Sequence, residues 1–177
     1  DGGALMTNNE ALGDNIQMIA NHGQSKRYYH DLVGCNSRLD SLQAAVLNIK
    51  LKYLDEYIAA RQRAAAYYSE AFKNIEGLQT PFIAPYSSHV FHQYTLLVKN
   101  DKRNALHDHL AQKGIPSMIY YPVPAHQQKM FEGVSDIPSH LTVTDSIKDE
   151  VLSLPMHTEL DEEQLKFITK AILDFFY

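Results

Sequence analysis

The stretch HQYTLLVKNDKRNALHDHLAQKGIPSMIYY, residues 92–121, decides the fold class of this chain. Its first part, residues 92–98, predicts a strand, and residues 101–113 predict a helix that stops at Gly114. Residues 115–121 predict a second strand, which ends at a proline-rich segment. A strand, a helix and a strand in succession predict a β-α-β unit, and therefore an α/β domain.

The sequence after this unit predicts three more helices and one more strand. Short helices are expected at 127–132 and 144–152, and a short strand at 153–156. The last helix begins at a capping box, Asp161-Glu-Glu-Gln164, in which each end residue can bind the other's backbone N–H. Together with the β-α-β unit, these elements make a small α/β domain over residues 75–177.

A long helix is predicted ahead of this domain. Apolar and aromatic residues keep a helical spacing over residues 39–74, with no Gly or Pro among them, and Asn36 or Ser37 can serve as the N-cap. Because this length exceeds the usual 8–20 residues of a globular helix, we expect either a kink near residues 53–55 or a spine that joins two domains.

A strand at 2–7 and a helix at 9–20 lead into a polar and aromatic loop at 21–30. Beyond that loop, Asn36 and Arg38 lie at the mouth of the long helix, where an amide donor, a guanidinium and free backbone N–H groups suit a phosphate or a carboxylate. From spacing alone, the alternative stays open that Asn36 is only a helix cap and Arg38 only a surface ion-pair partner.

Composition excludes several classes of protein. A net charge of −5 over 177 residues argues against a nucleic-acid-binding surface, and no apolar run approaches the roughly 20 residues that span a bilayer. Cys35 is the only cysteine, so we expect a soluble cytoplasmic protein without an internal disulfide. None of the nine histidines has metal-ligand spacing, so no metal site is expected. The opening Asp1-Gly2-Gly3 reads as an internal cut in a longer chain.

Several short motifs follow one another in a fixed order along the chain. They are His22-Gly23, Tyr28-Tyr29-His30, Gly34-Cys35-Asn36-Ser37-Arg38-Leu39, Gln43-Ala44-Ala45, Tyr121-Pro122-Val123-Pro124-Ala125-His126 and Leu152-Ser153-Leu154-Pro155-Met156-His157. In this combination the chain resembles the DegT/DnrJ-type sugar aminotransferases. These are fold-type I enzymes that use pyridoxal 5′-phosphate (PLP) to put an amino group on a keto-sugar nucleotide.

The resemblance implies a division of the chain. Residues 1–38 are expected to be the tail end of the large PLP-binding domain, with its last strand and helix elements. Residues 39–74 are expected to be the helix that links the domains, and 75–177 the small C-terminal α/β domain. The Schiff-base lysine that holds PLP is expected upstream of Asp1, so this chain should contain no catalytic residue, bind no PLP by itself and be inactive alone.

The resemblance also implies roles for particular residues. Asn36 is expected to bind the PLP phosphate in the other subunit of a homodimer with shared active sites. Arg38 is expected to contact the substrate, and Tyr120 and Tyr121 to line the sugar side of the same pocket. Wall or nucleotide contacts are expected from four further residues, namely His22, Gln24, Arg27 and His30.

Within the family, the motifs are most similar to those of UDP-N-acetyl-3-oxo-glucuronate aminotransferases. That similarity implies a 3-keto UDP-N-acetylglucuronate substrate, glutamate as amino donor, and a role in making surface polysaccharide such as lipopolysaccharide. The alternatives are a 4-keto-sugar aminotransferase, a PLP sugar dehydratase of the same fold in which histidine replaces the lysine, and a non-catalytic dimerisation module. An absence of nucleic-acid and membrane partners is expected in each case.

Overall fold

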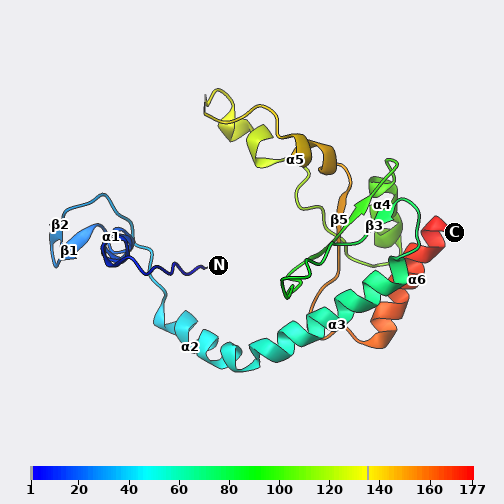
Figure 1. The fold of residues 1–177 in the computed structure, drawn as a ribbon, viewed down its shortest axis with the longest axis horizontal. Coiled ribbons are helices and arrows are strands. Elements are labelled where there is room, and N and C mark those ends of the chain that lie inside the picture. Colours follow the sequence, from blue (N-terminus) through cyan, green and yellow to red (C-terminus); the bar gives the residue numbers. More distant parts are fainter. Residues whose placement is uncertain (1, 135) are drawn as a thin grey trace. The chain divides into compact units, whose positions relative to one another are not determined.

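A computed structural model describes residues 2–134 and 136–177. The chain divides into two compact units, the first ending at Tyr53 and the second running from Leu54 to Tyr177 (Figure 1). The first unit contains α1 (Glu10–Ala20), β1 (Gln24–Lys26), β2 (Tyr29–His30), α2 (Ser41–Lys50) and the 3-10 turn η1 (Leu51–Tyr53). The second contains α3 (Leu54–Phe72), β3 (Leu78–Gln79), β4 (Tyr94–Val98), α4 (Arg103–Gln112), η2 (Ala125–Gln127), η3 (Lys129–Phe131), α5 (Thr142–Ile147), β5 (Val151–Leu154) and α6 (Glu162–Phe176).

The first unit differs from expectation at its start. The predicted helix at 9–20 is present as α1, and the Asn9 side chain caps it by accepting a 3.1 Å hydrogen bond from Leu12 N. The strand predicted at 2–7 is wrong, because these residues are irregular and pair with no described strand. A strand needs a neighbouring strand to bind its backbone groups. The sequence did not predict the antiparallel hairpin of β1 and β2.

The long helix is confirmed as a nearly continuous run, α2, η1 and α3, broken only by the 3-10 turn at Leu51–Tyr53. The turn overlaps the predicted kink region, residues 53–55, at Tyr53. The expected N-cap at Asn36 or Ser37 is wrong. The helix begins after Asp40, whose backbone N–H donates to Gln43 Oε1 at 3.2 Å. Residues 37–39 therefore lie outside the helix and have no regular secondary structure.

The second unit is built on a three-stranded antiparallel sheet in the order β3-β4-β5. Beyond β5, Met118 forms an isolated antiparallel bridge with Ser153. Since β4 and the Met118 segment both run antiparallel to β5, they run parallel to each other, with α4 connecting them. The predicted β-α-β connection is therefore present, with β5 between its two strands.

Three of the elements predicted in this unit have the wrong bounds. The strand expected at 115–121 is reduced to the Met118 bridge, because Pro116 has no N–H to donate to a ladder. The helix expected at 144–152 ends at Ile147, and the strand expected at 153–156 lies at Val151–Leu154. All four residues of β5 are buried, and the pairing with β4 decides their conformation.

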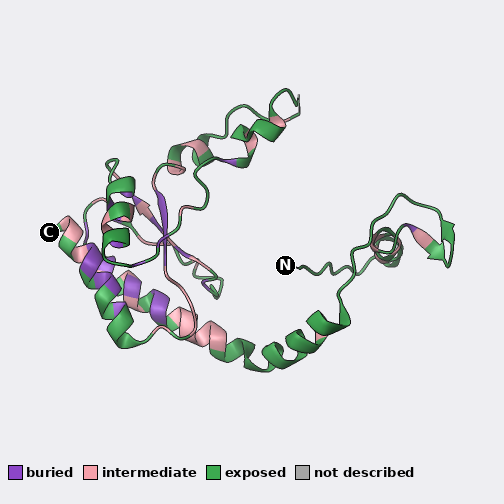
Figure 2. Ribbon diagram, turned by 180° about the vertical axis from the view of Figure 1, so that it is seen from behind, coloured by how far each residue is buried: buried purple, intermediate pink, exposed green. Residues whose placement is uncertain are grey.

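The core lies between this sheet and helices α3, α4 and α6, where buried residues concentrate (Figure 2). Its fully buried large side chains are Tyr68, Phe72, Tyr94, Leu96, Val98, Leu106, Leu110, Leu152 and Ile172. The predicted capping box of α6 is confirmed. Gln164 N donates to Asp161 Oδ1 at 2.8 Å, and Asp161 N donates to Gln164 Oε1 at 3.1 Å. In contrast, Gly23 alone is buried among residues 2–53.

Candidate functional site

Residues 22–38, which carry the motifs of the first unit and form its motif loop, depend on two glycines at a close backbone crossing. Gly23 has φ +74°, and a Cβ there would lie 1.7 Å from the carbonyl oxygen of Leu32. A Cβ on Gly34 would lie 2.2 Å from Gly23 N. No other residue lets the two segments approach so closely. The glycine of the His-Gly motif and the first position of the Gly-x-Asn-x-Arg motif are thus explained by backbone packing.

This crossing ties residues 34–37 to the end of α1. Cys35 N donates to Ile19 O at 2.8 Å, and Ser37 N donates to Ala20 O at 2.9 Å. Asn21 and Asn36 form an antiparallel bridge. The backbone of Asn36 is therefore fixed on both sides, although the residue itself is exposed.

Asn36 and Arg38 are joined directly, since Arg38 Nε donates to Asn36 Oδ1 at 2.9 Å. With its oxygen engaged, the Asn36 amide keeps its NH₂ group as a donor, and Arg38 keeps its two terminal nitrogens. Arg38 forms no ion pair within the described residues, and Asp40 rather than Asn36 caps the helix. Asn36 is therefore not the cap of this helix, and Arg38 has no ion-pair partner in the described part of the chain, while the ligand roles of both residues stay predictions.

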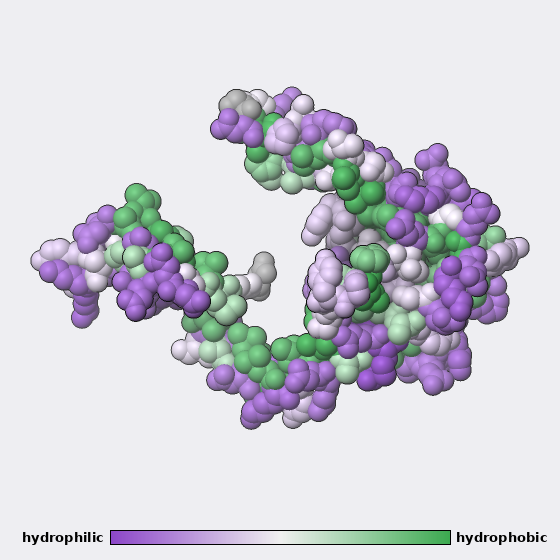
Figure 3. Space-filling view, viewed as in Figure 1, coloured by the Kyte–Doolittle hydropathy of each residue, from purple (hydrophilic) through white to green (hydrophobic). Residues whose placement is uncertain are grey.

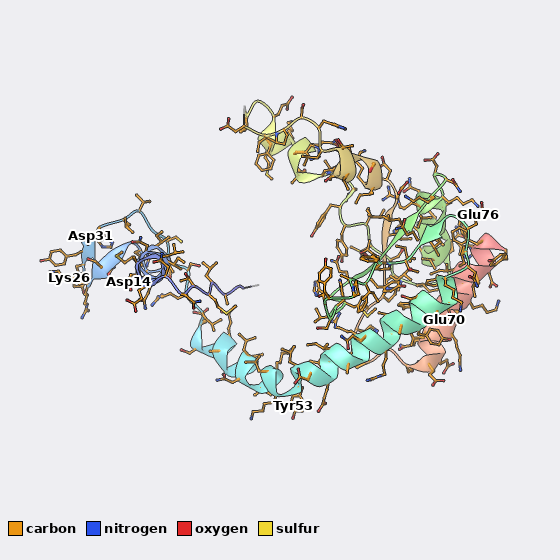
Figure 4. All side chains as sticks on the ribbon, viewed as in Figure 1. Asp14, Lys26, Asp31, Tyr53, Glu70 and Glu76 are labelled. Atoms are coloured by element: carbon orange, nitrogen blue, oxygen red, sulfur yellow. The ribbon has the colours of Figure 1, made fainter. Side chains whose placement is uncertain are left out.

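The other predicted residues of the first unit gather on the same loop. The His30 ring Nδ1 lies 2.8 Å from the carbonyl oxygen of His22, and Gln24 pairs with His30 across the hairpin. Arg27 lies over the ring of Tyr28, 4.9 Å from its centroid. Lys26 and Asp31 belong to this hairpin region in Figure 4. His22, Arg27 and His30 are exposed and Gln24 is half-buried. None of these four side chains packs into a hydrophobic core.

Tyr120 and Tyr121 lie in the second unit, just beyond the Met118 bridge. Their rings meet edge-on with centroids 5.5 Å apart. Tyr120 lines a cavity of about 190 Å³ together with His92, Gln93, Pro116, Met118, Ser153, Leu154, Pro155 and Met156. Tyr121 is 69% exposed and is not among those lining residues. The phenol of Tyr120 can therefore donate to or accept from a ligand that enters this cavity.

Sequence reasoning missed Arg61, which holds the walls of this cavity in place. Its Nη1 donates to the carbonyl oxygens of Phe91, His92 and Met156 at 3.2, 3.1 and 3.2 Å. His92 and Met156 both line the Tyr120 cavity. The available signal was an arginine at 61, which is half-buried beside the Ala- and Tyr-rich stripe of α3, whereas Arg63 on the same helix is exposed.

The donors on the first unit suit parts of PLP and of a sugar acid. The Asn36 amide suits a phosphate oxygen, and the planar guanidinium of Arg38 suits a carboxylate. A covalent link to PLP needs a lysine in a pocket. Lys26, on the same loop, is instead exposed and lies 4.1 Å from the centroid of the Tyr29 ring. No lysine is among the described residues that line the Tyr120 cavity.

Across residues 2–134 and 136–177, no helix combines the length and apolarity needed to cross a membrane. In the same residues, no group of three or more His, Cys, Asp or Glu side chains is arranged to hold a metal ion.

Known proteins match this chain along almost its whole length. It is 43% identical over 172 residues to the UDP-2-acetamido-2-deoxy-3-oxo-D-glucuronate aminotransferase of Pseudomonas aeruginosa, a match that covers 97% of this chain and 46% of the relative. It is 40% identical to the UDP-N-acetyl-3-dehydro-alpha-D-glucosamine 3-aminotransferase of Acidithiobacillus ferrooxidans, covering 97% and 45%. The chain thus spans about half the length of these curated relatives.

Solved structures are also similar to this chain over almost its whole length. The crystal structure of S. venezuelae DesV in complex with a ketimine intermediate superposes with a TM-score of 0.88 at 32% identity, covering 96% of this chain and 45% of DesV. The model of the DegT/DnrJ/EryC1/StrS aminotransferase family matches residues 1–173. With its motif loop, its α/β unit and these matches, the chain belongs to the DegT/DnrJ/EryC1/StrS aminotransferase family.

Proposed function

We propose that this chain is the carboxy-terminal part of a cytoplasmic, PLP-dependent aminotransferase. The whole enzyme transfers an amino group from glutamate to a 3-keto UDP-N-acetylglucuronate in the synthesis of surface polysaccharide. The observation that carries the proposal is the exposed, hydrogen-bonded pair of Asn36 and Arg38, in a chain 43% identical to an aminotransferase named for that sugar.

In this proposal each residue of the pair has one ligand. The Asn36 NH₂ group donates to the phosphate of PLP, and Arg38 binds the sugar carboxylate through its two terminal nitrogens. The hydrogen bond from Arg38 Nε to Asn36 Oδ1 favours an orientation that leaves the Asn36 NH₂ group and the terminal nitrogens of Arg38 available to these ligands. When bound, PLP supplies the electron sink and carries the amino group.

The remaining predicted residues bind the rest of the substrate. Tyr120 hydrogen-bonds a sugar hydroxyl from the wall of its cavity, and Tyr121 packs beside it. His22, Gln24, Arg27 and His30 contact the nucleotide. Arg27 is the cation among these four, and a diphosphate is the ligand that a guanidinium suits.

The proposed enzyme is a homodimer in which Asn36 serves the site of the partner subunit. The exposed apolar residues of α2 support this assembly, and hydrophobic side chains follow that helix in Figure 3. They are Leu42 (80% exposed), Val46 (50%), Leu47 (45%) and Ile49 (62%). An apolar face of this kind on a soluble protein marks a contact surface.

Substrate discrimination tests the proposal. The full-length enzyme is expected to prefer the 3-keto uronate over the matching 3-keto glucosamine nucleotide, which has a hydroxymethyl group in place of the carboxylate. Arg38→Ala removes charge-assisted hydrogen bonds worth about 2 kcal/mol, so kcat/KM for the uronate should fall about thirtyfold. The glucosamine nucleotide should be little affected.

Arg63→Ala is the matched control, because Arg63 is an exposed arginine on α3 outside the proposed site. It should leave both kcat/KM values unchanged. If Arg38→Ala lowers kcat/KM equally for both sugars, Arg38 does not bind the carboxylate and the uronate assignment fails.

A further inference from the structure

The segment that follows the tyrosine pair folds around the carboxylate of Asp145 in α5. Asp145 Oδ1 accepts hydrogen bonds from His126 Nε2 at 2.9 Å and Gln127 Nε2 at 2.7 Å. Oδ2 accepts from Leu141 N at 2.9 Å and lies 2.6 Å from His140 Nδ1. One carboxylate thus joins the residues of η2 to the start of α5.

The hydrogen bonds to Asp145 are the main contacts that hold residues 122–134 and 136–149 in one conformation. Among residues 122–134 and 136–149, only Pro124 is buried, so little apolar burial is available to hold the segment. The His126 side chain is 4% exposed and that of Asp145 is 13% exposed. Buried polar groups are costly unless paired, so these side chains favour the one conformation in which they meet.

Asp145 is negatively charged at neutral pH, as its hydrogen-bond donors require. Burial by itself raises the pKa of the Asp145 carboxyl group. The backbone N–H of Leu141 and the neighbouring His126 and His140 outweigh that effect, and the net pKa lies below its ordinary value. Asp145 is therefore a carboxylate at neutral pH and acts only as an acceptor.

Along the chain, Tyr120 and Tyr121 lie between two anchored positions, Met118 and the hydrogen-bond cluster around Asp145. On one side, Met118 is bound to Ser153 of β5 by two backbone hydrogen bonds, of 3.0 and 2.7 Å. On the other, Tyr121 is five residues from His126. Prolines restrict φ twice in that interval, and Gln128 Nε2 donates to Val123 O at 3.0 Å. Fixing His126 therefore fixes the direction in which the chain leaves Tyr121.

We propose that Asp145 is a positioning residue: through His126 and Gln127 it holds the segment 120–127, so that Tyr120 and Tyr121 face the sugar in the geometry the reaction needs. Asp145 does not touch the sugar or the cofactor. The proposal rests on the proposed function, because the sugar is the ligand assigned to the tyrosine pair.

The decisive variant is Asp145→Asn in the full-length enzyme. The amide nitrogen of asparagine cannot accept a hydrogen bond. Either His126 and Gln127, or Leu141 N and His140, therefore lose their acceptor. Amide hydrogen exchange of residues 120–131 should become faster, while exchange in α3 and α6 stays unchanged. Because displacement by about 1 Å can cost up to a hundredfold in rate, kcat/KM for the keto-sugar nucleotide should fall about ten- to a hundredfold. The half-reaction with glutamate should be unchanged.

Two further variants separate positioning from loss of structure. Asp149→Asn, two residues beyond α5 with a side chain 66% exposed, is the control and should match wild type in exchange and in both half-reactions. In a Tyr120→Phe, Tyr121→Phe background, Asp145→Asn should lower kcat/KM for the sugar by less than twofold, because it acts through the tyrosine pair.

Unchanged exchange in 120–131 overturns the proposal, and so does an equal fall in both half-reactions. A full loss in the double-Phe background overturns it as well. A wild-type enzyme that aminates no keto-sugar nucleotide overturns the proposed function and this role with it. An active wild type combined with any of the first three results overturns the role of Asp145 alone.

Discussion

At the scale of single residues, the motif loop is governed by backbone geometry as much as by side-chain chemistry. Gly23 and Gly34 permit the crossing that fixes the backbone of Asn36, and the Arg38 hydrogen bond then orients the Asn36 amide. The polar residues of the motif can bind a ligand only if the two glycines let the loop close.

Gly23→Ala should therefore disrupt the loop. Its Cβ would lie 1.7 Å from Leu32 O at a φ of +74°, so the backbone must move. The full-length enzyme carrying this substitution should lose most of its PLP absorbance. Gly13→Ala in α1 is the control: its Cβ would meet Thr7 Cγ2 at an ordinary 3.7 Å. That change should stabilise the helix by about 0.5–1 kcal/mol. Equal cofactor content in the two variants would show that cofactor binding does not depend on the glycine crossing.

Two buried tyrosines should make the second unit sensitive to alkali. Burial raises the pKa of Tyr94 to about 12, against a smaller opposing effect of its hydrogen bond with Ser69. Burial, and then the neighbouring Tyr94, raise the pKa of Tyr68 further. Each phenol is protonated in the folded state at pH values where the unfolded chain ionises. Their contribution to stability is present below about pH 10 and is lost as pH rises toward 12.

Urea unfolding followed by circular dichroism measures this effect. The free energy of unfolding should be flat with respect to these groups up to about pH 9 and should fall steeply above pH 10. Tyr94→Phe should reduce the slope in that window, at the cost of the Ser69 hydrogen bond, about 1 kcal/mol at neutral pH. A variant with the wild-type slope would show that Tyr94 is not responsible.

Among the helices and strands, those marked by nearby residues in the sequence were predictable. Those whose bounds depend on pairing with a distant strand were not. The capping box at Asp161 and the uninterrupted helical spacing through α2 and α3 were read directly from the sequence. The strand at 115–121 was wrong because Pro116 has no N–H to donate to a ladder. The helix at 144–152 was wrong because Val151 and Leu152 pair with β4 as part of β5. Only the three-dimensional pairing contains that information.

The same distinction applies to the candidate site. Asn36 and Arg38 were identified from their motif, although the hydrogen bond between them was not. Arg61 and Asp145 act through backbone carbonyls and histidines far along the sequence, and no spacing rule connects them to their partners.

The start of α6 offers a direct test of a locally encoded element. Asp161→Ala removes the side-chain acceptor of Gln164 N and should lower the free energy of unfolding by about 1 kcal/mol. Asp161→Asn keeps an oxygen at this position and should lose much less. Thermal or urea unfolding distinguishes the two, and equal losses would mean that the capping hydrogen bond does not contribute.

At the scale of the whole molecule, the two units differ in what stabilises each. The second unit has its own core, whereas the first buries only Gly23 among its described residues and exposes the apolar face of α2. A unit without a buried core gains little from the hydrophobic effect on its own. We therefore expect the first unit to be stabilised by surfaces outside this chain, namely the rest of the enzyme and a second subunit.

Subunit complementation tests the shared site. One full-length variant carries Arg38→Ala and the other lacks the PLP-binding lysine, so each should have little activity alone. If Arg38 serves the partner's site, mixed dimers contain one site with both defects and one intact site, and activity should reappear on mixing. If each site is formed within one subunit, every site in the mixture keeps one defect and activity should stay low.

In the proposed enzyme, this chain supplies part of a PLP-dependent site that aminates a keto-sugar acid. The most direct measurement is the visible absorbance of the purified full-length protein during the two half-reactions. A band from bound PLP should disappear when glutamate is added and return when a 3-keto UDP-N-acetylglucuronate follows. A protein with no such band, or with a band that glutamate leaves unchanged, would contradict the claim.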